Sequence, residues 1–205
     1  LLRRLKTSGP EEVRAHPPHW LARSETVKGI GIVGDSLSDE YRFYAPDRVM
    51  ARNWVEILAS TRGFHFGDRK HTSRSGAHDQ RFAYNWSQSG ATTTSLIARG
   101  QHTGLAAQMT EGAAISLAAV TVGANDFADV LATSRSVSAM ESVLERASSN
   151  LATILDSLLR INRELKLAVF TAVDLRASPL LRGALLSGLI SAPLSDAYGS
   201  AITVF

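Results

Sequence analysis

The sequence contains no cysteine, and this absence excludes several kinds of chemistry. A chain without cysteine forms no disulfide framework, holds no cysteine-ligated metal and has no thiolate nucleophile. The sequence also has no uninterrupted apolar run of about 18 to 20 residues, so we expect no membrane-spanning helix. Lack of cysteine is compatible with any cellular compartment, and the location of the protein stays unknown at this point.

A dense basic cluster is also missing, although basic residues are in slight excess. The chain has 22 Lys and Arg against 19 Asp and Glu, which gives a formal net charge of +3. Nucleic-acid binding usually requires a basic stripe or a basic run interleaved with aromatic residues. We therefore expect no nucleic-acid partner. No G-x-G-x-x-G or G-x-x-x-x-G-K-[ST] motif follows a predicted strand, which disfavours a flavodoxin-like nucleotide or phosphate binder.

A length of 205 residues suits one α/β domain with a substantial core. We expect an N-terminal leader over residues 1–26 and a single domain over residues 27–205. His16 and His19 lie three residues apart in the leader, but two prolines separate them and no carboxylate lies in register. This spacing favours a surface turn, and we expect no metal site and no organic cofactor.

Short apolar runs alternate with helical patterns along the domain. The runs 27–33, 64–67, 115–122 and 166–173 predict strands, and apolar spacing predicts helices over 47–62, 95–111 and 136–162. Residues 68–80 are polar and predict a surface insertion, and Ser195 with Asp196 predicts the cap of a last helix. Because the connections are far too long for hairpins, we expect a parallel, doubly wound sheet.

Three groups of small and polar residues follow apolar runs. They are Gly34-Asp35-Ser36-Leu37, the segment from Asn85 through Gly90-Ala91-Thr92, and Gly123-Ala124-Asn125-Asp126. Ligands in open α/β sheets collect at the carboxyl ends of strands. Each motif alone also fits a structural role: a serine-capped loop for Ser36, a helix entry for Gly90 and an Asx turn for Asn125.

The order and spacing of these motifs resemble those of the GDSL, or SGNH, family of serine hydrolases. The resemblance covers most of residues 27–175 and implies a flavodoxin-like three-layer α/β/α sheet. It makes Ser36 the nucleophile and makes the N–H of Ser36, the N–H of Gly90 and the side-chain amide of Asn125 the oxyanion hole. Gly34, Asp35, Leu37, Gly123 and Asp126 complete the motifs. Neutral donors aimed at a tetrahedral oxyanion are the physical requirement for such a hole.

The family's last motif, an Asp and a His three residues apart, is absent. No histidine follows Asp174, and a serine hydroxyl is a poor nucleophile without a neighbouring base. Asp68-Arg69-Lys70-His71 matches the spacing but lies in the polar insertion, and we regard it as coincidental. His102 is the other histidine of interest, and we expect it on a helix surface.

Two explanations are open for the missing base. The chain is either an incomplete copy that lacks the last strand and helix of the fold, or a member that binds a ligand or carbohydrate without turnover. The sequence begins without Met and ends on Val204-Phe205 inside an expected helix, which favours the incomplete copy. We therefore expect an exposed sheet edge, self-association through it, and little or no esterase activity from these 205 residues.

The substrate that the resemblance implies is a small-molecule ester, such as an acyl or acetyl ester of a carbohydrate or lipid. Four aromatic residues are candidates to line the site or to pack in the core: Tyr41, Phe43, Tyr44 and Trp86. Many members of the family are exported, so a secreted or periplasmic location fits the resemblance, although no signal peptide is present in this sequence.

Overall fold

The computed structural model describes residues 27–40, 52–71, 80–133, 136–170 and 172–205. Three strands form a parallel sheet in the order β1 (Ile30–Gly34), β4 (Leu117–Thr121) and β5 (Lys166–Val169). A two-stranded antiparallel sheet pairs β2 (Arg69–His71) with β3 (Gln80–Phe82). The predicted leader 1–26 lies outside the described residues.

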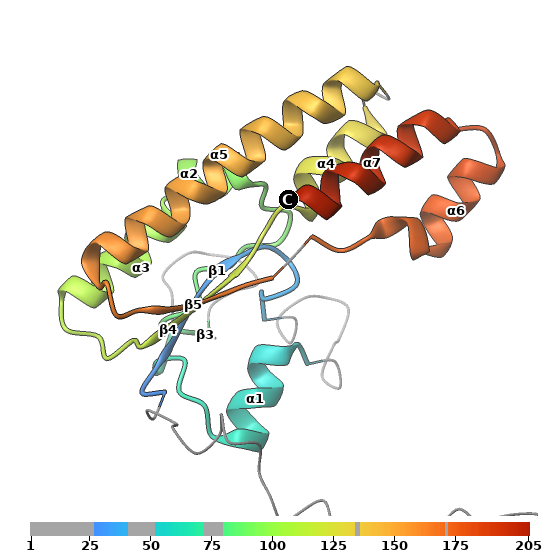
Figure 1. The fold of residues 1–205 in the computed structure, drawn as a ribbon. Coiled ribbons are helices and arrows are strands. Elements are labelled where there is room, and N and C mark those ends of the chain that lie inside the picture. The colour runs from blue at the N-terminus through green and yellow to red at the C-terminus, as the bar shows by residue number, and fades with distance from the viewer. Residues whose placement is uncertain (1–26, 41–51, 72–79, 134–135, 171) are drawn as a thin grey trace, which may run out of the picture.

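Helices cover both faces of the parallel sheet, which makes a three-layer α/β/α arrangement (Figure 1). One face packs against α1 (Trp54–Arg62) through Ile30, Ile32 and Ala119. The opposite face packs against α2 (Thr93–Ala98), α3 (Gln101–Thr110) and α5 (Val137–Ile161) through Val33, Ala118 and Val120. Successive side chains of β1 and β4 point to opposite faces, and helices cover both faces. Both strands are therefore continuous apolar runs in the sequence. The predicted α/β fold class is confirmed.

A further segment lies beside β1 on the side away from β4. The N–H of Ile32 donates to the carbonyl of Tyr84, and the N–H groups of Trp86 and Gln88 donate to Ile32 and Gly34. Asn85 forms an isolated parallel bridge with Ile32. Residues 84–88 therefore run parallel to β1 and bring the second motif to the same end of the sheet as the first.

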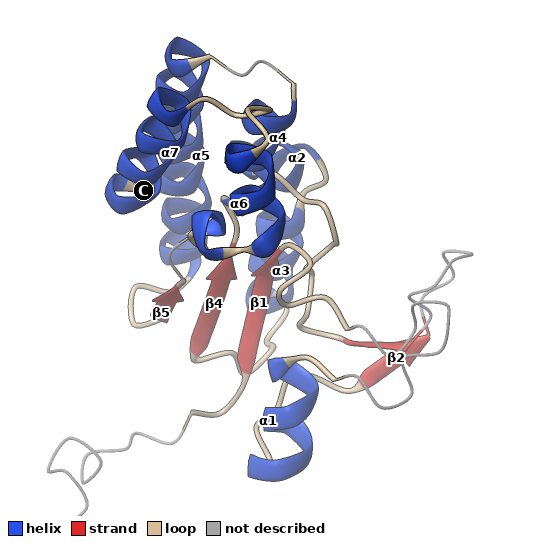
Figure 2. Cartoon of the chain, turned by 90° about the vertical axis from the view of Figure 1, so that its right-hand side faces the viewer, coloured by secondary structure: helices blue, strands red, loops and turns tan. Residues whose placement is uncertain are grey.

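The carboxyl ends of β1 and β4 point toward a second group of helices (Figure 2). This group consists of α4 (Ala124–Ala132), α6 (Pro179–Leu186) and α7 (Ala192–Val204). Phe127, Met140 and Tyr198 are buried together there, and the Tyr198 hydroxyl donates to the carbonyl of Val173 at 2.8 Å. This bond ties α7 to the segment that leaves β5.

Several predicted elements are confirmed. The helix predicted over 136–162 is α5, whose N-cap Ser136 accepts a bond from the Ala139 N–H and whose buried residues recur at helical spacing. Gly63 ends α1 in the left-handed conformation with φ of 67°. Strands are present within the runs 27–33, 115–122 and 166–173, with β1 extending one residue further, to Gly34.

Other predictions are wrong. Residues 64–67 form no strand, and the polar insertion instead contains β2 and β3. The helix predicted over 95–111 is divided into α2 and α3 at Gly100, whose φ of 66° breaks the helical path. The helix predicted over 47–62 begins at Trp54, because Asn53 and Glu56 form a capping box; residues 47–51 lie outside the described part. Ser195 and Asp196 lie inside α7, which Ser191 caps.

Candidate active site

Ser36 lies in the tight turn that follows β1. The Leu37 N–H donates to Oδ1 of Asp35 at 2.9 Å, and the N–H groups of Ser38 and Asp39 donate to the carbonyl of Asp35. The Asp35 N–H donates to the Thr121 carbonyl of β4 at 2.9 Å. Among the described residues, the N–H of Ser36 has no acceptor. Ser36 is partly exposed, so this N–H is available on the surface of the turn.

Gly34 allows the first motif to lie directly against β4. A Cβ at this position would be 2.1 Å from Oγ1 of Thr121 and 2.5 Å from its carbonyl oxygen. The N–H of Gly34 donates to Oε1 of Gln101 on α3 at 2.9 Å. Gln101 is fully buried, so a helix on one face of the sheet fixes the last residue of β1.

The turn around Gly90 leaves one N–H unbonded. The N–H groups of Ser89, Ala91, Thr92 and Thr93 have acceptors: Oδ2 of Asp39, the carbonyl of Gln88, Oγ of Ser95 and Oδ2 of Asp126. The N–H of Gly90 has none among the described residues. Gly90 is exposed, has φ of 76°, and would place a Cβ at least 4 Å from any neighbouring atom. Because glycine has no side chain, none obstructs a ligand that approaches this N–H.

Asn125 lies in the first turn of α4, directly after the end of β4. Its Nδ2 donates to the carbonyl of Ala91 at 2.9 Å, which joins the third motif to the second. A carboxamide nitrogen carries two hydrogens, so one remains available when the first is bonded in this way. The bond to Ala91 also fixes the orientation of the side chain.

Asp126 holds the start of α2. Its two carboxylate oxygens accept from the N–H and the hydroxyl of Thr93 at 2.8 and 2.7 Å, and Asn150 of α5 also donates to that hydroxyl. Burial raises the pKa of the Asp126 carboxyl, and the hydrogen bonds from Thr93 oppose this rise. Asp126 thus connects α4 with the residues that follow Gly90.

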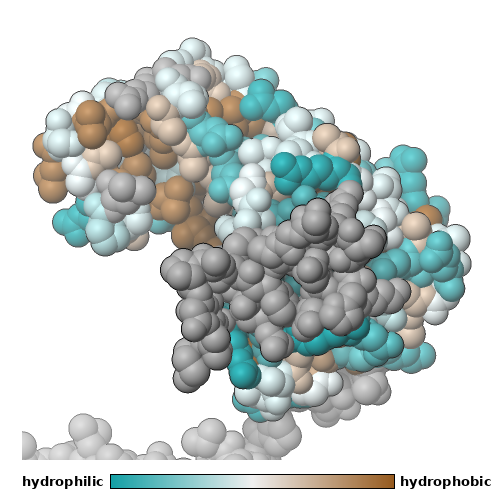
Figure 3. Space-filling view, turned by 180° about the vertical axis from the view of Figure 1, so that it is seen from behind, coloured by the Kyte–Doolittle hydropathy of each residue, from teal (hydrophilic) through white to brown (hydrophobic). Residues whose placement is uncertain are grey.

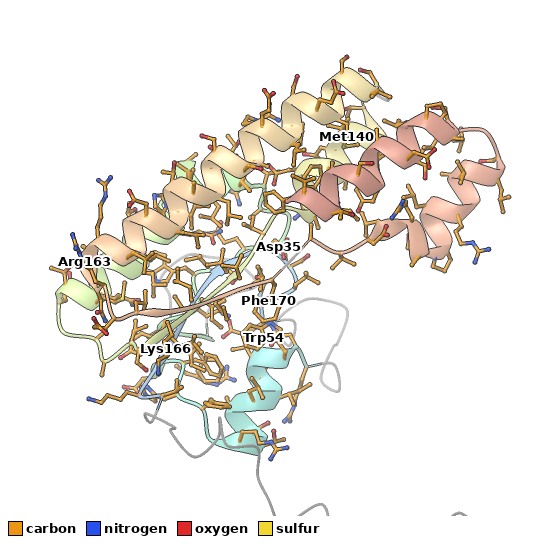
Figure 4. The ribbon with its side chains drawn as sticks, viewed as in Figure 1. Asp35, Trp54, Met140, Arg163, Lys166 and Phe170 are labelled. Carbon is orange, nitrogen blue, oxygen red and sulfur yellow. The ribbon has the colours of Figure 1, made fainter. Side chains whose placement is uncertain are left out.

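Asp35 is a second buried carboxylate at this end of the sheet (Figure 4). Burial raises its pKa, the negative charge of Asp126 raises the pKa further, and the hydrogen bond from Leu37 opposes both. Leu37 itself is 43% exposed beside Ser36.

Gly123 gives the third motif its shape. Its φ of 124° is a conformation that L-residues rarely adopt, and a Cβ there would lie 2.3 Å from the ring of Phe205. Phe205 also packs edge-on against Phe127, with ring centroids 5.5 Å apart. The end of α7 therefore lies against the loop that leads to Asn125.

Two histidines, His65 and His102, have described side chains. Nε2 of His65 lies 4.0 Å from Oδ1 of Asp68 in the exposed segment before β2. His102 is 6% exposed on α3, which corrects the expected surface position, and its Nδ1 has no hydrogen-bond partner among the described residues. Burial lowers the pKa of its imidazole.

Of the four aromatic candidates, only Trp86 lies in the described residues. Its ring packs against α3, where a Cβ on Gly104 would be 2.4 Å from it, and its Nε1 donates to Gln108 at 2.9 Å. Trp86 therefore contributes to packing between α3 and the segment beside β1. Tyr41, Phe43 and Tyr44 lie outside the described part.

Two buried side chains at this site have no local signal in the sequence. Gln101 contacts Gly34, and Asp39 contacts Ser89, across separations of 67 and 50 residues. A Gln at the start of a helix and an Asp at the end of a turn are common, so only the folded contacts reveal them. The Ser-Asp pair Ser38-Asp39 directly after the first motif was the nearest available clue.

The described residues contain no group of three or more His, Cys, Asp or Glu side chains placed to share a metal ion. None of the described helices combines the length and apolar character needed to cross a membrane.

The parallel sheet with helices on both faces defines a class of three-layer α/β/α proteins, and here a serine turn, a glycine turn and an asparagine follow β1, the segment 84–88 and β4. Within that class the chain belongs to the GDSL-like lipase/acylhydrolase family, whose model matches residues 30–190. The recognition made from the three motifs is therefore confirmed. No curated protein matches the sequence.

Proposed function

We propose that this chain carries the nucleophile and oxyanion hole of a serine hydrolase that cleaves carboxylic esters through an acyl-enzyme on Ser36. Membership of the acylhydrolase family supports the reaction class. One observation carries the assignment of the residues. In each of the two turns, 35–39 and 89–93, a single N–H lacks an acceptor among the described residues, and these belong to Ser36 and Gly90.

In the proposed reaction the hydroxyl of Ser36 attacks the ester carbonyl. The C–O bond to the alcohol breaks, the alcohol leaves with a proton, and water later releases the acid from Ser36. The carbonyl oxygen becomes an anion in both steps. The N–H groups of Ser36 and Gly90 and the amide of Asn125 would stabilise it, and loss of one such donor typically lowers turnover by about 100 to 1,000-fold.

The proposal requires a general base to accept the proton from Ser36. Among the described residues, neither His65, which lies in the exposed segment before β2, nor His102, which is buried on α3, has a hydrogen bond to Ser36. We propose that the base belongs to a histidine outside residues 1–205, and that these residues alone hydrolyse esters slowly or not at all.

The test compares the 205-residue chain with the product of the complete reading frame on p-nitrophenyl acetate, each with Ser36→Ala. We expect turnover from the longer protein and a loss of at least about 1,000-fold in Ser36→Ala. Ser60→Ala is a matched control, because Ser60 is exposed on α1 and bonds only the carbonyl of Ile57. If neither length turns over ester, the chain is a binding member of the family.

A further inference from the structure

Asp39 joins the serine turn to the glycine turn. It is fully buried, and its Oδ2 accepts from the N–H of Ser89 at 2.8 Å and from the hydroxyl of Ser89 at 3.1 Å. Ser89 directly precedes Gly90. Oδ2 of Asp39 thus accepts from both the N–H and the hydroxyl of Ser89, and Ser89 is the neighbour of the proposed oxyanion donor Gly90.

The backbone of Asp39 belongs to the same hydrogen-bonded turn as that of Ser36. The N–H of Asp39 donates to the carbonyl of Asp35 at 3.1 Å, and the carbonyl of Asp39 accepts from Nδ2 of Asn53, the N-cap of α1. The Asp39 side chain is therefore held by the same turn that presents Ser36. Any movement of this carboxylate would move Ser89 relative to Ser36.

A second carboxylate holds the other side of the glycine turn. Asp126 accepts from the N–H of Thr93 at 2.8 Å, three residues after Gly90. Gly90 lies between these two anchors, and its N–H is the one in this turn that has no acceptor among the described residues. Hydrogen bonds from backbone N–H groups to carboxylates are shorter and stronger than bonds between neutral groups, so both anchors resist displacement.

We infer that Asp39 is a positioning residue that sets the placement of the Gly90 N–H relative to the Ser36 hydroxyl. This inference rests on the proposed function. Oxyanion donors act only when they are held within about 0.5 Å of the productive geometry. Without Asp39, the Ser89 N–H would lack its acceptor, and the turn would be free to rotate the Gly90 N–H away from the anion.

The test uses the product of the complete reading frame, called the full chain here, and measures its kcat, its KM and its affinity for a boronic acid. A boronic acid forms a tetrahedral adduct on a serine and places an oxygen in the oxyanion hole, so its affinity reports the donors directly. For Asp39→Ala we expect kcat to fall by about 100-fold, KM to stay within about twofold, and the inhibition constant to rise in parallel with the loss of kcat. Asp39→Asn keeps an acceptor oxygen and should recover part of the loss.

Asp156→Ala is the matched control, because Asp156 is exposed on α5 and its partner among the described residues is the exposed Arg160. If Asp39→Ala fails to fold, Ser89→Ala removes the hydroxyl bond to Asp39 and keeps the bond from the Ser89 N–H, and a several-fold loss of kcat at constant KM supports the inference. Unchanged kcat and boronic acid affinity in the folded variant overturn it. Wild-type hydrolysis by Ser36→Ala would overturn the proposed function itself, which is a distinct result.

Discussion

Ser36 and Gly90 differ from their neighbours because the backbone N–H of each has no hydrogen-bond acceptor among the described residues. An unbonded N–H is costly when it is buried, but Gly90 is exposed and Ser36 is partly exposed, so water can occupy both donors. The bonded N–H groups on either side hold the backbone in place. A substrate oxygen can then replace water without reorganising either turn, which is the condition for an effective oxyanion hole.

Gly90→Ala tests whether that donor is functional. An alanine at φ of 76° adopts a left-handed conformation, which costs about 1 to 2 kcal/mol of folding stability. No atom lies within 4 Å of the new Cβ, so no steric clash adds to this cost. We expect ester turnover of the full chain to fall by about 100-fold or more, because the turn relaxes and the methyl group obstructs the anion. Turnover and urea unfolding measure the two effects.

Gly63→Ala is a matched control for the backbone strain. Gly63 has φ of 67° at the end of α1, and a Cβ added there would also meet no atom within 4 Å. The variant should lose similar stability and keep full turnover. Equal turnover in the two variants would contradict a role for the Gly90 N–H.

Contiguous motifs suggested some candidate site residues, whereas candidates that act across the fold belong to no motif. Ser36, Gly90 and Asn125 could be named because the order and spacing of the three motifs resemble those of the GDSL family. Gln101 and Asp39 could not, because their partners are distant along the chain. His102 was expected on a helix surface, whereas packing of α3 on the sheet buries it.

Element boundaries depended on the capping chemistry. Apolar periodicity predicted α5 within one residue at each end, since Ser136 is its N-cap. The same periodicity joined α2 and α3, because a single glycine, Gly100, does not interrupt an apolar pattern in the sequence. It also extended α1 too far toward Asp47, because the capping box at Asn53 and Glu56 was not recognised.

The carboxyl end of β1 should respond to pH through Asp35. The pKa of the Asp35 carboxyl is higher in the folded state than its unfolded value near 3.8. Protonation of Asp35 therefore stabilises the fold fully below the unfolded pKa, and this stabilisation is lost as pH rises through the folded pKa. Asp35→Asn removes the ionisation and keeps an oxygen for the Leu37 N–H. We expect the stability of Asp35→Asn, relative to wild type, to be greatest at neutral pH and to decrease as pH falls toward 4.

Urea unfolding of both proteins at several pH values measures this difference, and titration of the groups that do not interact with Asp35 cancels in the comparison. Because Asp126 adds to the rise in the pKa of Asp35, the difference should be smaller in an Asp126→Asn background. A pH-independent difference between wild type and Asp35→Asn would show that burial of the charge has no cost in the native state.

At the scale of the whole molecule, the parallel sheet was predictable because its strands are apolar on both faces. The pattern predicted a last helix, but it did not predict that α7 forms a separate group with α4 and α6, because contacts between helices that are distant along the chain leave no local pattern. Apolar residues are exposed where this group projects from the molecule (Figure 3), namely Leu185, Leu186 and Leu189. Such exposure on a domain this small favours association.

The outer edge of β5 is the other exposed apolar region. Among the described strands β5 pairs only with β4, and Val169, Phe170 and Val173 are each more than 40% exposed. The ring centroids of Phe170 and Trp54 lie 5.7 Å apart, so α1 contacts the residue that follows β5 (Figure 4). Unpaired N–H and C=O groups on an apolar edge strand are a template for pairing with another chain.

We expect the 205-residue chain to self-associate through the β5 edge, and sedimentation velocity over a range of concentrations measures it. Val169→Lys places a charge on the edge at a position that is 44% exposed, so it should shift the chain toward monomer with little loss of stability. Thr153→Lys adds the same charge on the exposed face of α5 and should leave association unchanged. If both variants associate as wild type does, the β5 edge is not the interface, and the leucines of α6 become the surface to substitute next. A monodisperse monomer at every concentration would instead mean that the sheet edge is adequately protected by its short length and by Lys166.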